Sequence, residues 1–562
     1  MVEKRHMRTV IVGGVAGGMS VATRLRRLDR DQDIVVLERG PYVSYANCGL
    51  PYYIGGAIKD RRSLILNTAE GLAARFALDV RTGTQVVSVD RERQVVVAQE
   101  LATGRRYEMG WDRLVLSPGA SPVVPDLPGI ERALPLRTVE DMDEIAIAVR
   151  EGGAATAVVV GAGFIGLEVA ENLSHAGLAV TVVELADQVL APLDPELAQL
   201  VADELTSHDV GLVLGAALAK VLPDAVELSD GRELPADIVV LAIGVRPEVG
   251  LARSAGLTIG PRGGISVDER QRTSDPRIYA VGDAAEKTDV LTREPVLVPL
   301  ANIANHQGRL AADDIADEPH PFGPVQGTAI IRVFGKVAAV TGWNEKRLKA
   351  AGRPYLAIHT HPGSHAGYYP GAEAMALKLL VEPASGCILG AGAVGGEGTD
   401  KRIDVLATAM RAGLRAPALA DLELSYAPPF GSAKDPVNML GYVAENRLNG
   451  NERSVQWHEL AERTAKGAVL VDARTAAEHA AGHIPGALSM PLDELYARRD
   501  ELAQFVAPGA ELIVYCQVGQ RAHTATRLLV QWGYVAANLD GGYLTWSAAT
   551  RAQRAAARTS KS

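Results

Sequence analysis

The segment Thr9-Val10-Ile11-Val12-Gly13-Gly14-Val15-Ala16-Gly17-Gly18 places a run of apolar, mostly β-branched residues directly before a glycine-rich turn. A helical pattern covers Met19–Leu28, and a second apolar run, Ile34–Leu37, ends at Glu38, 20 residues beyond Gly18. Glycines permit a tight turn, a close approach of the backbone to a pyrophosphate and close packing of the helix on the strand, while the helix N-terminus faces the phosphates. A carboxylate at the end of the second strand can accept hydrogen bonds from a ribose. The segment therefore predicts a dinucleotide-binding unit built on a parallel sheet.

This N-terminal unit departs from the usual glycine fingerprint at one position, because Val15 stands where the middle glycine is expected. A later strand, Arg277–Ala280, leads into Gly282 and Asp283. An Asp at such a strand end, followed by a helix, could bind the ribityl or pyrophosphate region of a flavin, although a generic loop is the alternative. The two segments together predict a discontinuous FAD-binding domain. Its candidate residues are Gly13, Gly14, Val15, Ala16, Gly17, Gly18, Glu38, Arg39, Ser117, Gly119, Gly282 and Asp283.

A second unit carries the complete fingerprint. The strand Ala157–Val160 leads into Gly161-Ala162-Gly163-Phe164-Ile165-Gly166 and then into a helical pattern. The next strand, Ala179–Val183, ends in Glu184, and no arginine follows immediately. A carboxylate there bonds a ribose 2′-hydroxyl and repels a 2′-phosphate, which favours NADH over NADPH. The candidate residues of this NAD site are Gly161, Gly163, Phe164, Ile165, Gly166, Glu184 and Gly244.

Two fingerprints, each with its acid at the proper distance, indicate a flavoprotein that binds two dinucleotides. Ser117–Ala120 and Ile243–Pro247 are then predicted to be the crossings between two nested domains, and simple turns are the alternative.

The segment Ser44-Tyr45-Ala46-Asn47-Cys48-Gly49-Leu50-Pro51-Tyr52 places a single cysteine ten residues after Glu38. A cysteine at this point is placed to meet a bound flavin. No second cysteine lies nearby, so a redox cycle there would need a sulfur from outside the segment. The alternative is a buried structural cysteine.

Length and composition limit the function classes. A chain of 562 residues should hold roughly three or four domains. No apolar run approaches the roughly 18 residues that a membrane span needs, and no signal-like leader opens the chain, so a cytoplasmic location is predicted. The net charge of −10 and the pI near 5.7 argue against general nucleic-acid binding. Three dispersed cysteines make no disulfide framework, and no metal site is predicted.

The two chain ends are predicted to lie outside the folded domains. Met1–Met7 reads as an extension before the first strand, and the basic stretch Arg551–Ser562 reads as a solvated, frayed tail.

A separate α/β pattern follows a polar stretch, Asn446–Glu452, which reads as a linker. The strand Glu511–Tyr515 delivers Cys516, and the loop Cys516-Gln517-Val518-Gly519-Gln520-Arg521 precedes a helix. Successive backbone N–H groups in such a loop form an anion-binding site, to which the helix dipole adds. A thiolate or persulfide on Cys516 would be stabilised by both. A phosphate-binding loop like that of the tyrosine phosphatases is the alternative.

Roughly the first 445 residues resemble the pyridine nucleotide-disulfide reductases. The most similar branch is coenzyme A-disulfide reductase, with the related NADH oxidases and NADH-dependent persulfide reductases. The resemblance rests on the two glycine fingerprints, Ser44–Cys48, Ser425–Phe430 and Lys434–Met439. It implies a homodimer whose third domain forms the interface and lends residues to the partner's active site.

The resemblance implies roles for individual residues. Cys48 would be the redox cysteine, flanked by Ser44 and Asn47, and would cycle between a thiolate and a mixed disulfide with coenzyme A. Such a thiolate needs a lowered pKa to attack or leave well. Tyr426 resembles the tyrosine that reaches the other subunit's flavin site, and Tyr368 and Tyr369 are candidates for a second tyrosine near the sulfur. The residues that resemble coenzyme A or substrate contacts are Ser20, Arg24, Arg27, Asn305 and Lys434. For the arginines a solvated helix face is the alternative, and Cys387 is expected to be structural, within an apolar strand.

Residues 454–550 resemble a rhodanese domain. The matches are Asp472-Ala473-Arg474, Gly482–Ala487, the Cys516–Arg521 loop and Gly541–Trp546. The six-residue loop fits sulfane-sulfur transfer better than the phosphatases, whose loop is typically longer. Cys516 would then carry the persulfide, Arg521 would position charge or close the loop, and Asp472 with Arg474 would order the scaffold.

The expected fold is α/β, with two nested Rossmann-like domains, an α+β dimerisation domain and an α/β rhodanese domain. The predicted boundaries are 1–120 with 249–325 for FAD binding, 121–248 for NAD binding, 326–447 for dimerisation, 448–453 for a linker and 454–550 for the rhodanese domain.

The leading hypothesis is a homodimeric FAD enzyme that uses NADH to reduce coenzyme A persulfide, coenzyme A disulfide or polysulfide. An NADH oxidase or peroxidase with Cys48 as a sulfenic acid, and a sulfur-relay protein that delivers persulfide to partners, are the alternatives. Neither a membrane nor a nucleic acid is an expected partner.

Overall fold

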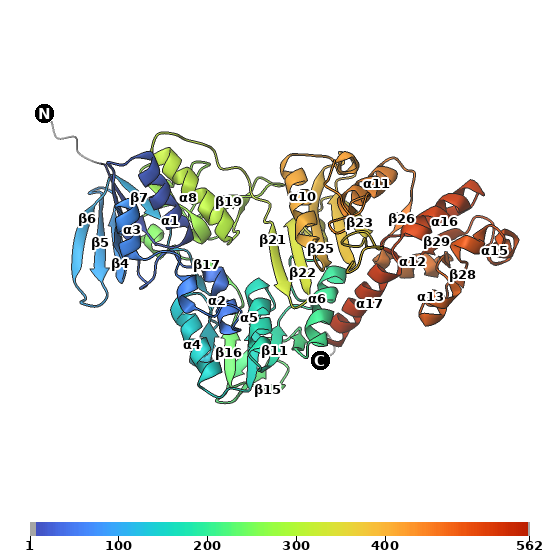
Figure 1. Ribbon diagram of the computed structural model, residues 1–562, viewed down its shortest axis with the longest axis horizontal. Coiled ribbons are helices and arrows are strands. Elements are labelled where there is room, and N and C mark those ends of the chain that lie inside the picture. Colours follow the sequence, from blue (N-terminus) through green and yellow to red (C-terminus); the bar gives the residue numbers. More distant parts are fainter. Residues whose placement is uncertain (1–6, 560–562) are drawn as a thin grey trace. The chain divides into compact units, whose positions relative to one another are not determined.

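The computed structural model describes residues 7–559, which form two compact units. The first unit contains residues up to 182 together with 218–325, and the second contains 183–217 together with 326 onwards (Figure 1). Met1–His6, most of the predicted N-terminal extension, and residues 560–562 of the predicted tail lie outside the described part.

The first unit contains a five-stranded parallel sheet in the order β18-β7-β1-β2-β3. Its strands are β1 (Arg8–Val12), β2 (Asp33–Leu37), β3 (Asp79–Arg81), β7 (Arg113–Leu116) and β18 (Ile278–Ala280). The pairing of β18 with β7 brings residues 164 positions apart into one sheet, for example Ile278 and Leu114, as expected of a discontinuous domain. The strand residues Val10, Ile11 and Val36 are fully buried, and each such side chain contributes roughly 1.5–3 kcal/mol to folding.

Helices cover this sheet, and an antiparallel meander adjoins it. Helices α1 (Ala16–Leu28) and α8 (Ala301–Ile315) pack against each other (Figure 1). The contact is close because a side chain at Gly308 would place its Cβ 2.5 Å from the Gly17 carbonyl oxygen. The other elements are α2 (Leu50–Ile54), α3 (Ala69–Phe76), β4 (Thr84–Asp90), β5 (Val95–Glu100) and β6 (Arg106–Gly110). A 3-10 turn, Gly282–Ala284, follows β18 where a helix was expected, and α8 begins only at Ala301.

A second sheet includes β11, β10, β16 and β9 as consecutive neighbours. Its elements are β9 (Leu134–Pro135), α4 (Val139–Arg150), β10 (Thr156–Val160), α5 (Phe164–His175), β11 (Ala179–Glu184) and β16 (Ile238–Leu241). The antiparallel strands β13 (Leu218–Val221), β14 (Ala225–Leu228) and β15 (Glu233–Pro235) form a small separate sheet. The two predicted crossings pair with each other, because β8 (Ala120–Pro122) and β17 (Val245–Pro247) form an antiparallel ribbon.

The second unit contains a five-stranded antiparallel sheet, here called the dimerisation sheet, in the order β21-β22-β25-β24-β23. Its elements are β21 (Ala329–Val333), β22 (Lys336–Gly342), α9 (Glu345–Ala350), β23 (Leu356–Thr360), β24 (Met375–Val381), β25 (Ile388–Gly395), α10 (Thr399–Arg411) and α11 (Pro436–Leu448). Every residue of β24 and β25 is buried, so both faces of these strands are covered. Helix α6 (Pro195–Ser207) contacts β25.

The C-terminal part of this unit is a parallel sheet in the order β26-β30-β29-β27-β28. Its strands are β26 (Ser454–Val455), β27 (Val469–Asp472), β28 (Leu488–Ser489), β29 (Glu511–Tyr515) and β30 (Val535–Leu539). Its helices are α12 (Leu460–Ala465), α13 (Ala476–Ala481), α14 (Leu492–Leu495), α15 (Arg499–Phe505), α16 (Gln520–Gln531) and α17 (Gly542–Thr559). Helix α17 packs against α6. The α/β fold class with its four kinds of domain agrees with the expectation from the sequence, while the residue boundaries stay a prediction.

Helix α11 continues to Leu448 and Glu452 is buried beside Arg447, while the bounds of the predicted linker stay a prediction. Two local expectations were wrong. The predicted tail is not frayed where the structure describes it, since α17 is helical to Thr559, although Arg551 is exposed as expected. Cys387 is exposed and lies just before β25 instead of inside an apolar strand. Among the described residues, no helix combines the length and apolar character needed to cross a membrane.

The close approach of β1 and α1 predicts a strong effect of Gly18→Ala. The new Cβ would lie 1.9 Å from the Gly13 carbonyl oxygen, so the turn must move. We expect the free energy of unfolding to fall by about 1–3 kcal/mol in chemical denaturation, as for other overpacked sites. Gly250→Ala is the matched control, since its Cβ would have no atom within 4 Å, and it should leave stability unchanged or slightly higher. Equal stability of the two variants would contradict the prediction.

Candidate functional site

The N-terminal glycine turn is shaped by backbone contacts that exclude side chains. Gly13 has a φ of +98°, and a Cβ there would lie 2.1 Å from the Ser117 carbonyl oxygen. At Gly17 a Cβ would lie 2.8 Å from the Ser117 hydroxyl. The turn therefore packs directly on the end of β7, and its backbone is free to face a phosphate.

Glu38 lies over the same turn. Its Oε2 accepts a hydrogen bond from the Gly14 N–H at 2.7 Å, and its Oε1 accepts one from the Gly40 N–H at 2.7 Å. Burial raises the pKa of this carboxyl, although the two backbone N–H groups act in the opposite direction. The neighbouring Arg39 is exposed. A fixed acid beside a side-chain-free turn fits the adenosine end of a dinucleotide.

The other predicted residues of this site converge on Arg137, which the sequence did not reveal. Its Nη2 donates to Asp283 Oδ2 at 2.8 Å, and it would lie 3.4 Å from a Cβ placed on Gly119. Gly282 adopts a φ of +77°, and its N–H donates to Gln307 Oε1 at 3.0 Å. The Ser117, Gly119, Gly282 and Asp283 segments are thus adjacent, as a single flavin site requires.

A buried lysine supports the Gly282 turn from below. Lys287 is 4% exposed, and its Nζ donates to the carbonyl oxygens of Gly282 at 2.6 Å and Ala285 at 2.9 Å. Burial lowers the pKa of Lys287 to about 8, while nearby Asp283 partly offsets this. No periodicity in the sequence distinguishes this lysine from a surface lysine.

A backbone hydrogen bond ties the segment that contains Cys48 to the glycine turn. The Ser44 N–H donates to the Gly14 carbonyl oxygen at 2.9 Å, and Ser44 has the unusual φ of +49°. Asn67 donates to the Ser44 hydroxyl at 3.2 Å. Four residues later, Cys48 lies in the 3-10 turn Asn47–Gly49 and remains solvent-exposed. The backbone therefore holds the cysteine segment on the nucleotide turn.

The surroundings of Cys48 do not lower its pKa. Burial by neighbouring atoms and the Glu168 carboxylate raise the pKa of the thiol, and Arg137 opposes them. These groups of the chain therefore do not supply the lowered pKa that a reactive thiolate needs. Glu168, on α5, accepts a hydrogen bond from the Tyr52 hydroxyl at 3.1 Å, and burial raises the pKa of Glu168 to about 7. Neither residue was identified from the sequence, because they lie 116 positions apart.

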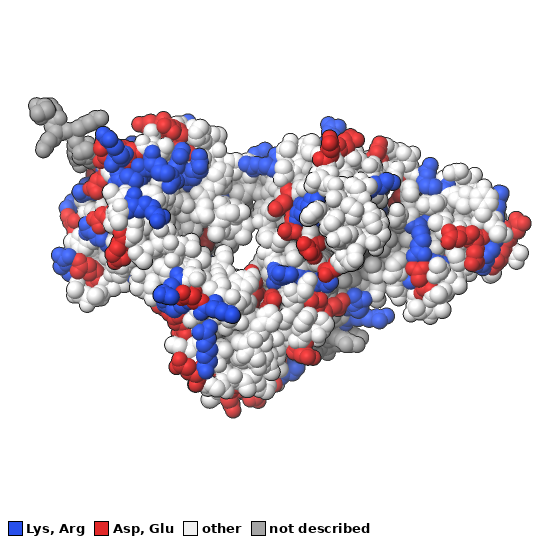
Figure 2. Space-filling model, viewed as in Figure 1, with Lys and Arg blue, Asp and Glu red and all other residues white. Residues whose placement is uncertain are grey.

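The predicted substrate residues on α1 and α8 are partly brought together. The Ser20 hydroxyl donates to Asn305 Oδ1 at 3.0 Å. Arg24 instead pairs with Asp313, at 2.6 Å between Nε and Oδ1, so part of its charge is already neutralised. Arg27 is exposed, and Figure 2 shows basic side chains gathered over the region of α1.

The second glycine fingerprint, Gly161–Gly166, is also shaped by close backbone contacts, and one of its glycines, Gly163, faces open space. A Cβ at Gly161, where φ is +107°, would lie 2.4 Å from the Ala242 carbonyl oxygen, and one at Gly166 would lie 1.9 Å from the Gly161 carbonyl oxygen. Gly163 has no atom within 4 Å of such a Cβ, so a ligand can approach its backbone. Phe164 and Ile165 begin α5, Gly244 has a φ of +112°, and β11 ends at Glu184. The turn fits a pyrophosphate.

Exposed aromatic residues mark one surface of the second unit. The hydroxyls of Tyr368 and Tyr426 lie 2.9 Å apart, and the two residues are 77% and 48% exposed. Tyr369 contacts the ring of His365 instead. The structure thus pairs Tyr368, of the two candidates, with Tyr426. Lys434 is exposed, directly before the buried Asp435 that caps α11.

Cys516 is fully buried at the end of β29, where a loop enters α16 through Gly519, which has a φ of +91°. Arg521 makes two hydrogen bonds to Glu478, at 2.8 and 2.6 Å, and the carboxylate raises the pKa of Arg521, with a smaller contribution from Cys516. Arg521 therefore places a positive charge beside the sulfur and is itself oriented by Glu478.

Asp472 and Arg474 form a buried pair beneath this loop. Arg474 Nη2 donates to Asp472 Oδ2 at 2.7 Å, and its Nη1 donates to Gln517 Oε1 at 3.2 Å. The Tyr515 hydroxyl also donates to Asp472 at 2.9 Å. The pair therefore orders both the strand ends and one side chain of the Cys516 loop.

Comparison with known proteins identifies the architecture. Residues 7–308 match the family described as pyridine nucleotide-disulphide oxidoreductase. The chain belongs to this family. Residues 331–436 match its dimerisation domain, and residues 456–549 match the rhodanese-like domain. The chain is therefore a flavin- and pyridine-nucleotide-dependent oxidoreductase with a rhodanese-like domain.

Several relatives share most or all of this architecture. Coenzyme A disulfide reductase of Staphylococcus aureus (strain JH9) is 34% identical over 441 residues, which is 78% of this chain and 100% of the relative. The crystal structure of reduced CoADR-RHD from Bacillus anthracis is 44% identical, with a TM-score of 0.95 over 97% of this chain and 98% of that chain. The NAD-dependent persulfide reductase from A. fulgidus is 38% identical, with a TM-score of 0.90 over 96% and 100%.

The charges around Cys48 predict opposite effects of two substitutions. Glu168→Gln should lower the pKa of the Cys48 thiol, and Arg137→Gln should raise it, because the carboxylate and the guanidinium act with opposite sign. The rate of iodoacetamide labelling between pH 6 and 10, in a background of Cys387→Ser and Cys516→Ser, measures this pKa. The same labelling curve for both variants would contradict the electrostatic assignment.

Proposed function

We propose that the enzyme uses NADH to reduce sulfane sulfur at Cys48, and that Cys516 carries persulfide sulfur to or from this reaction. Coenzyme A persulfide, coenzyme A disulfide and polysulfide are the proposed acceptors. The observation that carries the proposal is the lone Cys48, whose segment bonds to the dinucleotide turn through Ser44 and Gly14. The relatives named coenzyme A disulfide reductase and NAD-dependent persulfide reductase support it.

The proposed reaction balances with one reductant. A Cys48 thiolate attacks the inner sulfur of coenzyme A persulfide, breaks the S–S bond and releases hydrosulfide, which leaves a Cys48–coenzyme A mixed disulfide. Two electrons from NADH then reduce this disulfide to coenzyme A and the Cys48 thiolate. One coenzyme A persulfide, one NADH and one proton thus give one coenzyme A, one hydrogen sulfide and one NAD⁺.

The chain's residues bind the cofactors and manage protons. FAD, which would receive hydride and pass electrons to the sulfur, would bind the Gly13–Gly18 turn, Glu38 and Asp283. Because the pKa of Cys48 is raised, it must lose a proton before attack, and Arg137 favours that loss. Glu168, whose pKa is about 7, can accept or return a proton near neutrality, and the Tyr52 hydroxyl orients it.

We further propose a homodimer in which Tyr426 and Tyr368 enter the partner's active site. Both are exposed on the family's dimerisation domain, and their hydroxyls are already paired. Contiguous exposed aromatic residues are typical of such interfaces. Tyrosine hydroxyls there could donate hydrogen bonds to a sulfur anion.

NADH preference rests on Glu184. Glu184→Gln should reduce the ratio of kcat/KM for NADH to that for NADPH by about ten- to hundredfold, because one charge-assisted hydrogen bond and one repulsion are removed. Steady-state kinetics with both nucleotides measures this ratio. Asp187→Asn makes the same charge change three residues away and should leave it unchanged. An unaltered ratio in Glu184→Gln would remove the basis for NADH preference.

The two cysteines should separate the two half-reactions. In anaerobic NADH oxidation, Cys48→Ser should abolish turnover with coenzyme A persulfide, coenzyme A disulfide and polysulfide, since no other thiol lies on the nucleotide turn. Cys516→Ser should lose only sulfur transfer from thiosulfate, and Cys387→Ser serves as the control with full activity. Full turnover with oxygen and none with the sulfur acceptors would favour an NADH oxidase instead.

A further inference from the structure

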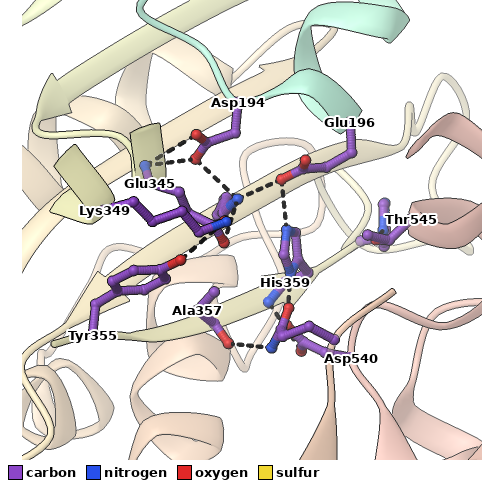
Figure 3. A network of polar contacts seen from close by, with 12 residues as sticks. Asp194, Glu196, Glu345, Lys349, Tyr355, Ala357, His359, Asp540 and Thr545 are labelled. Atoms are coloured by element: carbon purple, nitrogen blue, oxygen red, sulfur yellow. Dashed lines mark hydrogen bonds and ion pairs between the residues drawn. The ribbon is translucent and has the colours of Figure 1, made fainter. Parts of the chain in front are cut away.

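A cluster of charged side chains is buried in the second unit, where the dimerisation sheet, α6 and the rhodanese-like domain meet (Figure 3). We call it the buried ion cluster, and it consists of Asp194, Glu196, Glu345, His359, Lys378, Arg447 and Asp540. None of these side chains is more than 9% exposed. Charges are seldom buried in this number unless each is paired.

His359 lies at the centre of the cluster, on β23. Its Nδ1 lies 2.6 Å from Asp540 Oδ2, and its Nε2 lies 2.9 Å from Glu196 Oε1. A neutral imidazole has one N–H, so only the doubly protonated ring can donate to both carboxylates. Burial alone would lower the pKa of His359, but the carboxylates, Asp540 first, raise it to about 9.

Each cation of the cluster is paired with at least one carboxylate. Lys378 contacts Asp194 at 2.9 Å, Glu345 at 3.0 Å and also Glu196. Arg447 pairs with Asp540 and donates to the Ala357 carbonyl oxygen at 2.6 Å. Arg447 also lies 3.8 Å from the buried Glu452, and the exposed Lys349 pairs with Glu345 at 3.0 Å. Removal of the His359 proton would leave one of the two carboxylates beside its ring, Glu196 or Asp540, without a donor from His359.

Asp540 connects this cluster to the sulfur-carrying loop. It follows β30 directly and precedes Gly541 and Gly542, whose φ values are +66° and +62°. A Cβ on Gly542 would lie 2.4 Å from the Cys516 carbonyl oxygen. The Tyr543 N–H donates to that same oxygen at 2.8 Å. The segment after Asp540 therefore lies directly against the Cys516 loop.

A second contact fixes the same segment. His361, two residues after His359, bonds through Nε2 to the Thr545 hydroxyl at 2.7 Å. Burial and the neighbouring His359 lower the pKa of His361 to about 4, so this ring is neutral where His359 is charged. A Cβ on Gly541 would lie 2.8 Å from His359 Cβ and 2.0 Å from Thr545 Oγ1. The dimerisation sheet thus contacts the segment at both of its ends.

We propose that His359 is a positioning residue for the persulfide-carrying loop. Its ring, on the dimerisation sheet, is hydrogen-bonded to both Glu196 and Asp540, and through Asp540 it fixes the segment 540–545 that packs against the Cys516 loop. The proposal rests on the proposed role of Cys516 in sulfur transfer. The conformation of the Cys516–Arg521 loop in the rhodanese-like domain therefore depends on the proton of His359, which belongs to the dimerisation sheet.

The proton dependence has a defined sign. Because the pKa of His359 in the folded protein, about 9, lies above its ordinary value, the contribution of the imidazolium is complete below pH 6.5 and is lost as the pH rises through about 9. The groups that face His359 are Glu196 of α6, Lys378 of β24, Asp540 after β30, and His361 of its own segment. Lys378 acts against the imidazolium, and the carboxylates act for it.

The test uses the full-length flavin-loaded enzyme, with thiosulfate as sulfur donor and cyanide as acceptor. Cys516 would take the outer sulfur of thiosulfate, release sulfite and form thiocyanate. His359→Gln and Asp540→Asn should each lower kcat for thiocyanate formation about tenfold or more. The double variant should be no slower than either single variant, because both act through one contact. NADH oxidation with coenzyme A disulfide should stay unchanged.

Arg551→Gln is the matched control. Arg551 of α17 pairs with Asp203 of α6 at 2.8 Å, but both side chains are more than 40% exposed. An exposed pair contributes little, so this variant should match the wild type in both assays. Full thiocyanate formation by a folded His359→Gln variant would overturn the proposal.

A measurement on the wild type covers the case in which the variants do not fold. Hydrogen–deuterium exchange, corrected for the intrinsic pH dependence, should show protection of both 540–545 and 516–521 at pH 7. Both peptides should lose protection together above pH 9, before the Gly13–Gly18 segment does. Unchanged protection of the two peptides up to pH 10 would overturn the proposal. A wild type that forms no thiocyanate would overturn the sulfur-transfer function instead, and the exchange measurement would still decide the role of His359.

Discussion

The contact between the Gly13–Gly18 turn and the end of β7 is the constraint on which the reductase part of the molecule depends. A tetrahedral carbon does not fit between Gly13 and the Ser117 carbonyl oxygen, so the backbone itself forms the surface of the nucleotide site. The same turn accepts the Ser44 N–H through Gly14, and Cys48 follows four residues later. One set of backbone contacts therefore fixes both the glycine turn and the position of Cys48. Under the proposed function, a local change in this turn would affect cofactor binding and sulfur chemistry together.

The two sulfur sites are built on different physical principles. Around Cys48, a few partly buried ionisable groups, Glu168 and Arg137, act on an accessible thiol with opposite sign. Around Cys516, a fully buried thiol lies in a loop ordered by paired charges, Glu478 with Arg521 and Asp472 with Arg474. Under the proposed function, the first arrangement would allow the protonation state of the Cys48 sulfur to change during the reaction. The second would maintain a fixed electrostatic environment for a sulfur atom carried by Cys516.

Local sequence patterns were sufficient for features whose residues are neighbours in the chain. The two fingerprints, the Cys48 segment and the Cys516 loop each combine strand, turn and helix signals within about 30 residues. Long-range polar contacts were beyond such patterns: Glu168 meets Tyr52 across 116 residues, and Lys378 lies in an apolar strand with no local partner. The predicted tail is helical and not frayed, because it continues α17, which packs on α6, and basic composition alone does not reveal such a helix. The predicted site residues on the glycine turns do lie together, whereas Arg24 is engaged by a carboxylate that no local pattern marks.

The burial of Asp540 limits how the rhodanese-like domain can be separated from the rest of the chain. The rhodanese-like match begins at residue 456, so a gene boundary could be drawn in the short segment before it. The ion pairs cross that boundary, because the Asp540 carboxylate of the rhodanese-like domain pairs with His359 and Arg447, which both precede it. A rhodanese-like domain transplanted without them would leave the Asp540 carboxylate without these two partners. The rhodanese-like domain is therefore not freely exchangeable between family members. The protein that receives it would have to supply cations at the positions of His359 and Arg447.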